Sequence, residues 1–545
     1  MSKTKLLIER IRVGIDVSDE MIVNKAKEKM KRAGINTSTL HFRLYKKSID
    51  ARNKDDIRFE CAVLAEGDIS PKAFDKHVLE RAQARVFSEE EPTLTFGTNA
   101  MAAHPVVVGM GPAGLFAALL LAQNGYAPIL IDRGGSVAER TADVNRFRNA
   151  GVLNTESNVQ FGAGGAGTFS DGKLITRIND PLCNYVLKSL VAFGAPEDIC
   201  IKAKPHIGTD ILRVVVDNIL SEIERLGGSV IYHCRMDGIV ENADKTLCVK
   251  TTKGDLLAGA LLLAPGHSAR DTYHYLIKQN YAVEAKPMSV GVRVEHLQAD
   301  IDHALYGSFA GHPNLGPAEY ALSDTKGERG VYTFCMCPGG EVVAAASEEG
   351  GLVVNGMSYH ARNSQNANSA VVVSIRCEDY EKEEGSAPLG AIAFQRRIER
   401  AAFDAGGSNY DAPVMTMQDF LEGNNAHICG RVTPSYRDGK VKEADFSRIF
   451  PAFVTDSLRY GFCSFGQKLK GFDAPDTMLT AAETRTSAPV RILRNKESMT
   501  AVGHPLIYPC GEGAGYAGGI TSAAVDGLRA AMALMSAFAP TKENQ

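Results

Sequence analysis

Three glycines and an aspartate between Pro105 and Asp132 have the types and spacing needed to bind the pyrophosphate and ribose of a dinucleotide. Gly109 permits a tight turn after a strand, Gly111 lets the backbone approach a pyrophosphate, and Gly114 allows a helix to pack closely on that strand. Asp132 follows about 20 residues later, where a carboxylate can accept hydrogen bonds from a ribose diol. The segment predicts a dinucleotide site, to which we also assign Pro112, Ala113 and Arg133.

The elements around these residues are those of a βαβ unit. The β-branched run Pro105 to Val108 leads into the glycines, an apolar helical stretch follows from Leu115 to Gln123, and a second strand from Ala127 to Ile131 ends on Asp132. The helix would present free N–H groups and the positive end of its dipole to the phosphates. A glycine-rich turn alone is weak evidence, but the complete unit is specific for dinucleotide binding.

Three later segments favour FAD over NAD. One predicted strand ends in Ala264-Pro265-Gly266, another ends before Gly511-Glu512, and a helix of small residues begins at Gly519 or Ile520. Each alone is also typical of an ordinary glycine-containing turn. Together and in this order they resemble a two-part FAD domain of the glutathione-reductase type, in which such segments approach the dinucleotide, bind a ribityl hydroxyl and direct a helix dipole at the flavin. The residues assigned to FAD here are Ala264, Gly266, Gly511, Glu512, Gly519 and Ile520.

A second match to the same glycine pattern, Gly162 to Gly167, favours a loop over a second dinucleotide site. The residues that follow it, Thr168 to Gly172, cannot begin a packed apolar helix. Glycines allow a backbone to pass close to a ring. We therefore expect this loop to approach the flavin and to contribute Gly164, Gly165, Gly167 and Lys173 to the cofactor site.

Candidate catalytic residues come from the second half of the chain. Arg293 and Glu295 alternate on a predicted strand and share one face, as an ion pair or as a substrate clamp, and the ion pair is the preferred interpretation. Cys335 and Cys337 are separated by one residue, unlike the Cys-x-x-Cys of dithiol oxidoreductases. We interpret them as pocket-lining strand residues, with a redox pair as the alternative. Arg485 precedes the last predicted FAD strand, with Glu483 and Ser487, and could face the ring.

One more basic segment is a candidate for the site. Lys204-Pro205-His206 could place a cation and an imidazole near the cofactor, although His206 could equally be a core histidine. No metal site is predicted, because two cysteines do not make a zinc site and no cluster of His, Asp and Glu has ligand spacing.

These motifs resemble those of a bacterial family of FAD-dependent dehydrogenases of unassigned substrate, the NAD/FAD-utilising dehydrogenase-like proteins. The resemblance covers most of the chain, including a small N-terminal domain. It implies the fold and the cofactor, and it supplies no substrate. The segments that carry it are Phe161 to Lys173, Lys204 to Asp210, Ser289 to His296, Cys335 to Gly340, Asn355 to Tyr359, Glu483 to Ser487 and Gly511 to Gly519.

A chain of 545 residues is too long for one ordinary core, so several domains are expected. The predicted fold class is α/β: a Rossmann-like FAD-binding domain of glutathione-reductase type, with an inserted, mainly-β α+β substrate domain and a small ferredoxin-like α+β N-terminal domain. The predicted ranges are 1–95 for the N-terminal domain, 102–278 and 479–545 for the two parts of the FAD domain, and 279–478 for the substrate or cap domain.

Within these ranges the hydrophobic periodicity predicts individual elements. The N-terminal domain should contain strands at 6–17, 40–49 and 57–64, a helix at 19–32 and another that opens at Asp68 to Pro71, before a linker from Glu89 to His104. The FAD domain should contain an amphipathic helix at 207–226, short strands at 229–233, 238–241 and 246–251, one buried strand at 256–263, a strand at 505–509 and a helix at 520–538. Residues 280–475 show few long helical patterns.

Net charge and cysteine content indicate which classes of partner and which cellular compartment to expect. A net charge of −4 gives no general reason to bind nucleic acid or anionic membrane, and no apolar stretch approaches the length of a membrane span. Eleven scattered cysteines suit reduced thiols better than a disulfide framework. The first ten residues carry charges where a signal peptide needs an apolar run. We therefore expect a cytoplasmic protein with a small-molecule substrate and with neither nucleic acid nor membrane as a partner.

The leading functional hypothesis is an FAD-dependent oxidoreductase that transfers a hydride between a small molecule and flavin N5. NAD(P)H, oxygen or a redox protein partner would complete the second half-reaction. A flavin monooxygenase or a prenyl-type reductase is the alternative among enzymes. A flavin-binding RNA-modifying or regulatory protein, which would dock through the N-terminal domain, is the alternative from another class. The basic residues between Lys25 and Lys54 are interspersed with acids, which is more typical of a solvated face.

Overall fold

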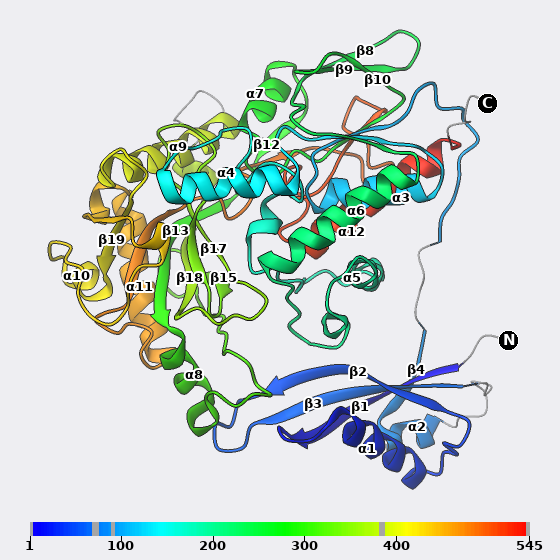
Figure 1. Cartoon of the computed structure of the whole chain (residues 1–545), viewed down its shortest axis with the longest axis vertical. Coiled ribbons are helices and arrows are strands. Elements are labelled where there is room, and N and C mark those ends of the chain that lie inside the picture. Colours follow the sequence, from blue (N-terminus) through cyan, green and yellow to red (C-terminus); the bar gives the residue numbers. More distant parts are fainter. Residues whose placement is uncertain (1–3, 68–75, 89–92, 381–386, 541–545) are drawn as a thin grey trace.

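The computed structural model describes residues 4–67, 76–88, 93–380 and 387–540. Figure 1 shows a small N-terminal unit beneath a larger body, which contains one parallel sheet and a second, mostly antiparallel sheet. The protein is therefore mixed α/β with a parallel sheet. The predicted helix start at Asp68 to Pro71 and the first residues of the predicted linker lie outside the described residues.

The N-terminal unit is a four-stranded antiparallel sheet in the order β2-β3-β1-β4. Helix α1 packs on it through Ile22, Ala26 and Met30, and the Ser18 hydroxyl caps the helix by accepting a hydrogen bond from the Met21 N–H. The predicted strands and first helix are confirmed. Strand β4 was not predicted, because four largely uncovered residues carry no alternation. The bounds are β1 Thr4–Gly14, α1 Asp19–Arg32, β2 His41–Asp50, β3 Arg58–Gly67, α2 Lys76–Ala82 and β4 Ala84–Phe87.

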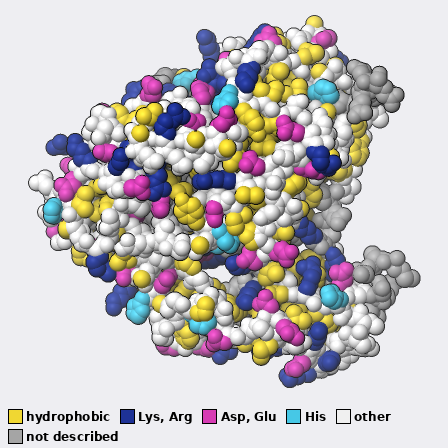
Figure 2. Space-filling model, in the orientation of Figure 1, with side chains coloured by type: hydrophobic (Ala, Val, Ile, Leu, Met, Phe, Trp, Pro, Cys, Tyr) yellow, Lys and Arg dark blue, Asp and Glu magenta, His cyan; other side chains and the backbone are white. Residues whose placement is uncertain are grey.

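Hydrogen bonds join this unit to the larger body at several places, one of which is from the Lys54 ammonium to the Ala304 carbonyl of the body at 2.5 Å. The Lys47 N–H donates to the Ile201 carbonyl at 2.9 Å, and the Ala203 N–H donates to the Lys47 carbonyl at 3.0 Å. The Asn314 amide donates to the Ile15 carbonyl at 2.9 Å. Figure 2 shows the surface hollowed between the unit and the body, and on this face acidic and basic side chains are interspersed.

The parallel sheet has five strands in the order β23-β11-β5-β6-β7. The predicted βαβ unit is confirmed, with α3 between β5 and β6. Helix α3 is apolar on all sides because it is covered by α12 as well as by the sheet. A side chain on Gly527 of α12 would lie 2.0 Å from the Ala113 carbonyl, so the two helices touch closely. The bounds are β5 Val106–Val108, α3 Pro112–Gln123, β6 Ile129–Ile131, α6 Thr209–Arg225, β7 Ser229–Ile231, β11 Leu261–Leu263, β23 Ile507–Pro509 and α12 Ile520–Ala537.

The single buried strand predicted at 256–263 is wrong. The run is divided into β10 (Leu256–Ala258), which pairs with β9 (Leu247–Thr251) in a small antiparallel sheet with β8 (Met236–Glu241), and β11 in the parallel sheet. The chain changes sheets at Gly259, where a side chain would lie 2.4 Å from the Ala103 carbonyl. An unbroken apolar run gave no sign of this change.

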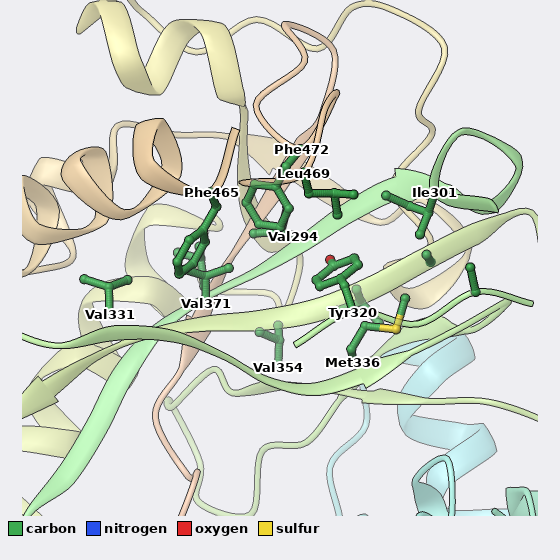
Figure 3. Packing of buried hydrophobic residues seen from close by; sticks show 14 of the residues in the cluster. Val294, Ile301, Tyr320, Val331, Met336, Val354, Val371, Phe465, Leu469 and Phe472 are labelled. Carbon is green, nitrogen blue, oxygen red and sulfur yellow. The ribbon is translucent and has the colours of Figure 1, made fainter. Parts of the chain in front are cut away.

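The second large sheet has seven strands in the order β14-β15-β18-β13-β21-β19-β20. Figure 3 shows its hydrophobic packing, in which Val294 and Val371 lie beside Phe465 and Phe472. The predicted strand that carries Arg293 and Glu295 is β13. The bounds are β13 Met288–Leu297, β14 Ser323–Asp324, β15 Val331–Cys337, β18 Asn366–Ile375, β19 Ala412–Thr416, β20 Val441–Glu443 and β21 Met478–Glu483.

Two long helices lie between 280 and 475, where the sequence shows few long helical patterns. Helix α9 (Ala387–Ala405) buries the polar residues Gln395 and Glu399, which obscures its apolar stripe. Helix α11 (Ala452–Lys468) contains Gly461, where a side chain would lie 2.5 Å from Val331 of the sheet. Glycine in a helix lowers its propensity, but here it allows the helix to approach the strand.

The chain crosses between the two sheets at β12 (Val283–Ala285) and returns at β22 (Val490–Ile492), and these two strands pair with each other. Strand β21 is part of the seven-stranded sheet, although the predicted range 479–545 places most of it with the FAD domain. The remaining helices are α4 Val137–Ala150, α5 Leu182–Ala192, α7 Arg270–Lys278, α8 Gln298–Tyr306 and α10 Met417–Glu422, the remaining strands β16 Glu341–Ala344 and β17 Val354–Met357, and the 3-10 helices η2 Ala166–Phe169, η3 Glu197–Cys200, η4 Gly307–Phe309, η5 Cys377–Asp379, η6 Tyr436–Asp438 and η7 Phe446–Arg448.

Candidate functional site

A cavity of about 310 Å³ lies at the carboxyl ends of the parallel strands β5, β6, β11 and β23. This edge of an open α/β sheet is where such folds bind ligands. Gly114, Arg133 and Gly164 do not line the cavity. The other predicted cofactor residues do: Gly109, Gly111, Pro112, Ala113, Asp132, Gly165, Gly167, Lys173, Ala264, Gly266, Gly511, Glu512, Gly519 and Ile520.

The first glycine turn has the geometry that its spacing predicted. Gly109 has φ +100°, and a side chain on it would lie 2.1 Å from the Ala264 carbonyl. A side chain on Gly114 would lie 1.9 Å from the Gly109 carbonyl, so Gly114 serves the packing of α3 and not the cavity. A side chain on Gly111 would meet only Gly165 Cα at 3.9 Å. The space before Gly111 is therefore open, and the N-terminus of α3 faces it.

Asp132 lies at the end of β6 and lines the cavity. Its Oδ2 accepts a hydrogen bond from the Met110 N–H at 2.8 Å, and its Oδ1 accepts one from the Gly134 N–H at 2.9 Å. A carboxylate has about four acceptor positions, so both oxygens retain capacity for a ribose diol. Two backbone donors thus fix the orientation of this carboxylate.

Arg133 does not lie where the sequence placed it. It lines a smaller adjoining cavity, together with Gly109 and Asp132. Its guanidinium forms ion pairs with Asp271 and Glu156 and lies 4.5 Å from the centre of the Phe161 ring. Two carboxylates already satisfy this cation, so it holds loops together at the rim.

The loop Gly162 to Gly167 packs on the first glycine turn and continues into the 3-10 helix η2, in agreement with the prediction that it starts no α-helix. The Gly164 N–H donates to the Met110 carbonyl at 2.8 Å, and a side chain on Gly165 would lie 2.7 Å from Gly111 Cα. Gly165 lines the cavity beside this contact. Gly167 lines it beside Ile520, from which a side chain on Gly167 would lie 3.0 Å.

Arg140 of α4 holds this loop, and sequence reasoning missed it. Its guanidinium is fully buried, and burial lowers its pKa to about 9. An arginine on a largely polar helix gives no sequence signal of this role. The residues whose carbonyls accept its hydrogen bonds are Asn158, Val159, Gly162, Ala163 and Gly165.

The carboxyl-terminal segment closes the cavity from the other side. A side chain on Gly513 would lie 2.5 Å from the Gly266 backbone, so these two distant segments cross in contact. Burial raises the pKa of Glu512 to about 7, and the nearby Lys286 opposes that rise. Gly519 precedes α12, whose first turn has no side-chain cap and faces the cavity through Ile520.

Among the catalytic candidates, Cys335 and Arg485 line the cavity, together with Phe334, Asn355, Glu483 and Thr486. Arg485 is almost fully buried and forms an ion pair with Glu399 at 3.0 Å. Glu399 also pairs with Arg270 at 2.7 Å, which gives a buried arginine–glutamate–arginine triad behind the cavity. The triad fixes the guanidinium of Arg485, and no feature of the sequence revealed it.

The predicted ion pair between Arg293 and Glu295 is wrong. Arg293 pairs with Glu483 of β21 at 2.9 Å, whereas Glu295 accepts hydrogen bonds from Ser435 and Asn366. Burial raises the pKa of Glu295, and those hydrogen bonds oppose the rise. Neither Arg293 nor Glu295 lines the cavity, nor does Cys337 or Ser487. Strand pairing decides which partner Arg293 meets, and the sequence does not show that pairing.

Lys204 and His206 do not line the cavity either. The His206 ring stacks on the His360 ring at 5.3 Å, and burial lowers the pKa of His206 to about 4, so that it is neutral near pH 7. Glu319 pairs with two lysines: its Oε1 lies 3.0 Å from Lys204 Nζ, and its Oε2 lies 3.1 Å from Lys173 Nζ. Lys173 is thus the cation of this group that reaches the cavity.

Protonation of Glu319 is expected to destabilise the fold in acid. Lys173 and Lys204 lower the pKa of Glu319 to about 2 against the effect of its burial. Because the folded pKa lies below the unfolded value near 4.3, this stabilisation is complete above about pH 4.3 and is lost as the pH falls towards 2. The loss is about 3 kcal/mol. Urea unfolding from pH 6 to 2.5 measures it, and Glu319→Gln should flatten this part of the profile. An identical profile in the variant would show that other carboxylates govern the acid range.

No group of three or more His, Cys, Asp or Glu side chains in the described ranges has the arrangement of a metal site. Within the same part of the chain, no helix is long and apolar enough to cross a membrane.

Comparison with known proteins gives one family and one close relative. Residues 287–486, which contain the seven-stranded sheet, match the family model described as FAD-dependent protein, C-terminal domain-like. An uncharacterized protein of Clostridium beijerinckii is 45% identical over 539 residues, which cover 97% of this chain and 98% of that protein.

Solved structures give only distant similarity. The tetracycline destructase Tet(51) aligns over 79% of this chain and 80% of its own, with 10% identity and a TM-score of 0.33. The thioredoxin reductase of Lactococcus lactis aligns over 30% of this chain and 35% of its own, with 15% identity and a TM-score of 0.18. Scores this low carry no argument about the present chain.

Proposed function

The chain belongs to one family with the Clostridium beijerinckii protein and carries the C-terminal domain of FAD-dependent proteins, and from this premise we propose that it is an FAD-dependent oxidoreductase. It would transfer a hydride between a small-molecule substrate and flavin N5. The observation that carries the proposal is the convergence on one cavity of the βαβ glycine turn and the segment from Gly511 to Ile520. The first segment lies near the start of the larger body's part of the chain, and the second lies near its end. A two-part FAD domain requires both.

The residues present fit each part of FAD. The open space before Gly111 and the N-terminus of α3 suit the pyrophosphate, and the fixed carboxylate of Asp132 suits the adenosine ribose. Glu512 suits a ribityl hydroxyl, and the first turn of α12 suits the electron-rich edge of the ring. When bound, the flavin supplies the capacity to accept or donate a hydride.

The side chains opposite these motifs would orient a substrate. Lys173 and Arg485 present cations to the cavity, the first held by the half-buried Glu319 and the second by the fully buried Glu399. Asn355 and Thr486 present polar groups. Such charges near a reacting centre stabilise an anion that forms there. A substrate that carries or develops negative charge fits this lining best.

We propose the finer fold assignment on the same grounds. Residues 102–278 and 479–545 would be the two parts of one FAD domain, because β23 completes the sheet that β5 begins. The pairing of β12 with β22 brings together the two crossings into the inserted domain. The N-terminal unit, with two helices and the strand order β2-β3-β1-β4, would be a ferredoxin-like domain.

An anaerobic titration with NADH and with NADPH tests the proposed activity. Bleaching of the flavin absorbance by either one is the expected result and identifies the electron donor. If neither bleaches a flavin that dithionite reduces, the nicotinamide half-reaction is wrong, and oxygen or a redox protein becomes the partner to test.

Replacing Glu512 with alanine is expected to weaken FAD binding about ten- to a hundredfold. A hydrogen bond between a carboxylate and a hydroxyl contributes roughly 1.5–3 kcal/mol. The dissociation constant is measured by fluorescence quenching during reconstitution. Glu497→Ala, which alters an exposed glutamate outside the cavity, is the control and should change nothing. Equal constants for both variants would place Glu512 away from the cofactor.

A further inference from the structure

Two cysteines of β15 lie beside the proposed flavin site. Cys335 is half-buried and lines the same cavity as Glu512 and Ile520. Cys337 is fully buried, and its thiol donates a hydrogen bond to the Cys335 carbonyl at 3.3 Å. Met336, between them, packs into the hydrophobic cluster shown in Figure 3. One thiol is thus accessible from the cavity and the other is enclosed behind it.

The backbone at Cys335 is held in an unusual conformation. Its φ is +46°, in the left-handed region that side chains other than glycine rarely adopt. The pairing of β15 with β18 changes register between Phe334 and Cys337, as at a bulge, and bulges redirect side chains near functional sites. The buried Arg293 guanidinium donates to the Cys335 carbonyl at 2.8 Å and supports this conformation. Strained residues held by their surroundings cluster at active sites.

The charges around Cys335 favour its thiolate. The neighbouring Cys337 side chain has the largest effect, and the cations Arg293 of β13 and Lys173 of the glycine-rich loop add to it. Burial, Glu483 of β21 and Glu512 after β23 oppose it, although Glu483 is paired with Arg293. Together they lower the pKa of Cys335, while the neighbouring Cys335 side chain and burial raise the pKa of Cys337 well above its usual value. An accessible thiolate beside a buried thiol is the arrangement of an attacking and a resolving cysteine.

We propose that Cys335 and Cys337 form a redox-active pair that exchanges two electrons with the flavin, and that the substrate class is thiols and disulfides. This inference rests on the proposed FAD-dependent function and adds a second redox centre to it. A dithiol reacts with an external disulfide by thiolate attack, and the accessible Cys335 is the attacking sulfur.

The exchange balances with the flavin as the only other reactant. In the oxidising direction, one S–S bond forms between Cys335 and Cys337, and the S–H bond of Cys337 breaks. A bound oxidised flavin would supply the capacity to accept the two electrons and that proton. In the reverse direction, the S–S bond between Cys335 and Cys337 would break on accepting two electrons and one proton, which a bound reduced flavin would supply. Cys337 would regain the proton, and Cys335 would be left as the thiolate.

Anaerobic dithionite titration of the holoprotein tests the pair. Air-oxidised wild type should take up about four electrons per flavin, because a flavin and a disulfide each accept two. Cys335→Ser and Cys337→Ser should each take up about two. Cys183→Ser, which alters a half-buried cysteine outside the cavity, is the matched control and should behave as wild type.

Thiol counting gives a readout that needs no turnover and no variant. Reduced wild type, denatured in a thiol reagent, should show all eleven cysteines as free thiols, and the oxidised form should show two fewer. Peptide mapping should place the missing pair at Cys335 and Cys337. An FAD-containing protein with eleven thiols in both states and an uptake of two electrons overturns the pair and leaves the proposed flavoenzyme intact. A protein that binds no flavin overturns both.

Discussion

Gly111→Val is expected to abolish FAD binding while the chain still folds. The position lies at the N-terminus of α3, where the pyrophosphate of the proposed cofactor would approach the backbone. A Cβ there meets no protein atom nearer than Gly165 Cα at 3.9 Å, so valine fills space that a ligand needs and that the fold leaves open. The flavin-to-protein ratio and a thermal melt of the apoprotein give the two measurements.

Two other glycines make this prediction specific. Gly14→Val, in β1 and with no neighbour within 4 Å, should keep both the fold and the flavin. Gly114→Val should fail to fold, because its side chain would lie 1.9 Å from the Gly109 carbonyl. Wild-type flavin content in a folded Gly111→Val protein would show that no phosphate lies at this turn.

Glu399→Gln is expected to destabilise the protein by about 3–5 kcal/mol, because it leaves buried charges without their partner. Glu399 is fully buried between Arg270 and Arg485, and it also accepts a hydrogen bond from Thr484 at 2.7 Å. The amide carries no charge, so Arg485 loses the carboxylate with which it pairs. Urea unfolding at pH 7 measures the loss.

A glutamate on the nearby surface provides the control for the Glu399→Gln variant. Glu349 is exposed, and Glu349→Gln should change stability by less than about 0.5 kcal/mol. Because Arg485 lines the cavity, the Glu399 variant should also alter the absorbance spectrum of bound flavin, whereas the Glu349 variant should not. Glu348 also pairs with Arg270, at 3.0 Å. A change in stability below about 1 kcal/mol for Glu399→Gln would mean that Glu348 or water compensates the two arginines.

The parts of the fold that sequence predicted are those determined locally. The βαβ unit has its glycines, apolar helix and terminal acid within one short segment, and α1 carries its own cap at Ser18. This unit alone is enough to predict that Gly109, Gly111 and Asp132 line the cavity. The positions of Ala264 and Glu512 at the cavity were also predictable, because glycines, and in the second case an acid, mark the ends of the strands that precede the cavity.

The parts that sequence missed depend on distant pairing. Arg293 meets Glu483 and not Glu295 because β13 pairs with β21, nearly two hundred residues later in the chain. The buried face of helix α9 is not recognisable from the sequence, because it carries the charged Glu399, which pairs with Arg270 and Arg485. Arg140 holds the glycine-rich loop through carbonyl oxygens, which every residue possesses. Polar residues in buried networks therefore look like surface residues until the fold is known.

The measurement that tests the account most directly is the identity and amount of flavin released from the purified protein. The protein should be yellow and should release FAD on denaturation, about one per chain, because Asp132 and the βαβ unit require an adenosine ribose. Chromatography and mass determination separate FAD from FMN. Recovery of FMN alone, or a colourless protein that cannot be reconstituted with FAD, would contradict the central claim.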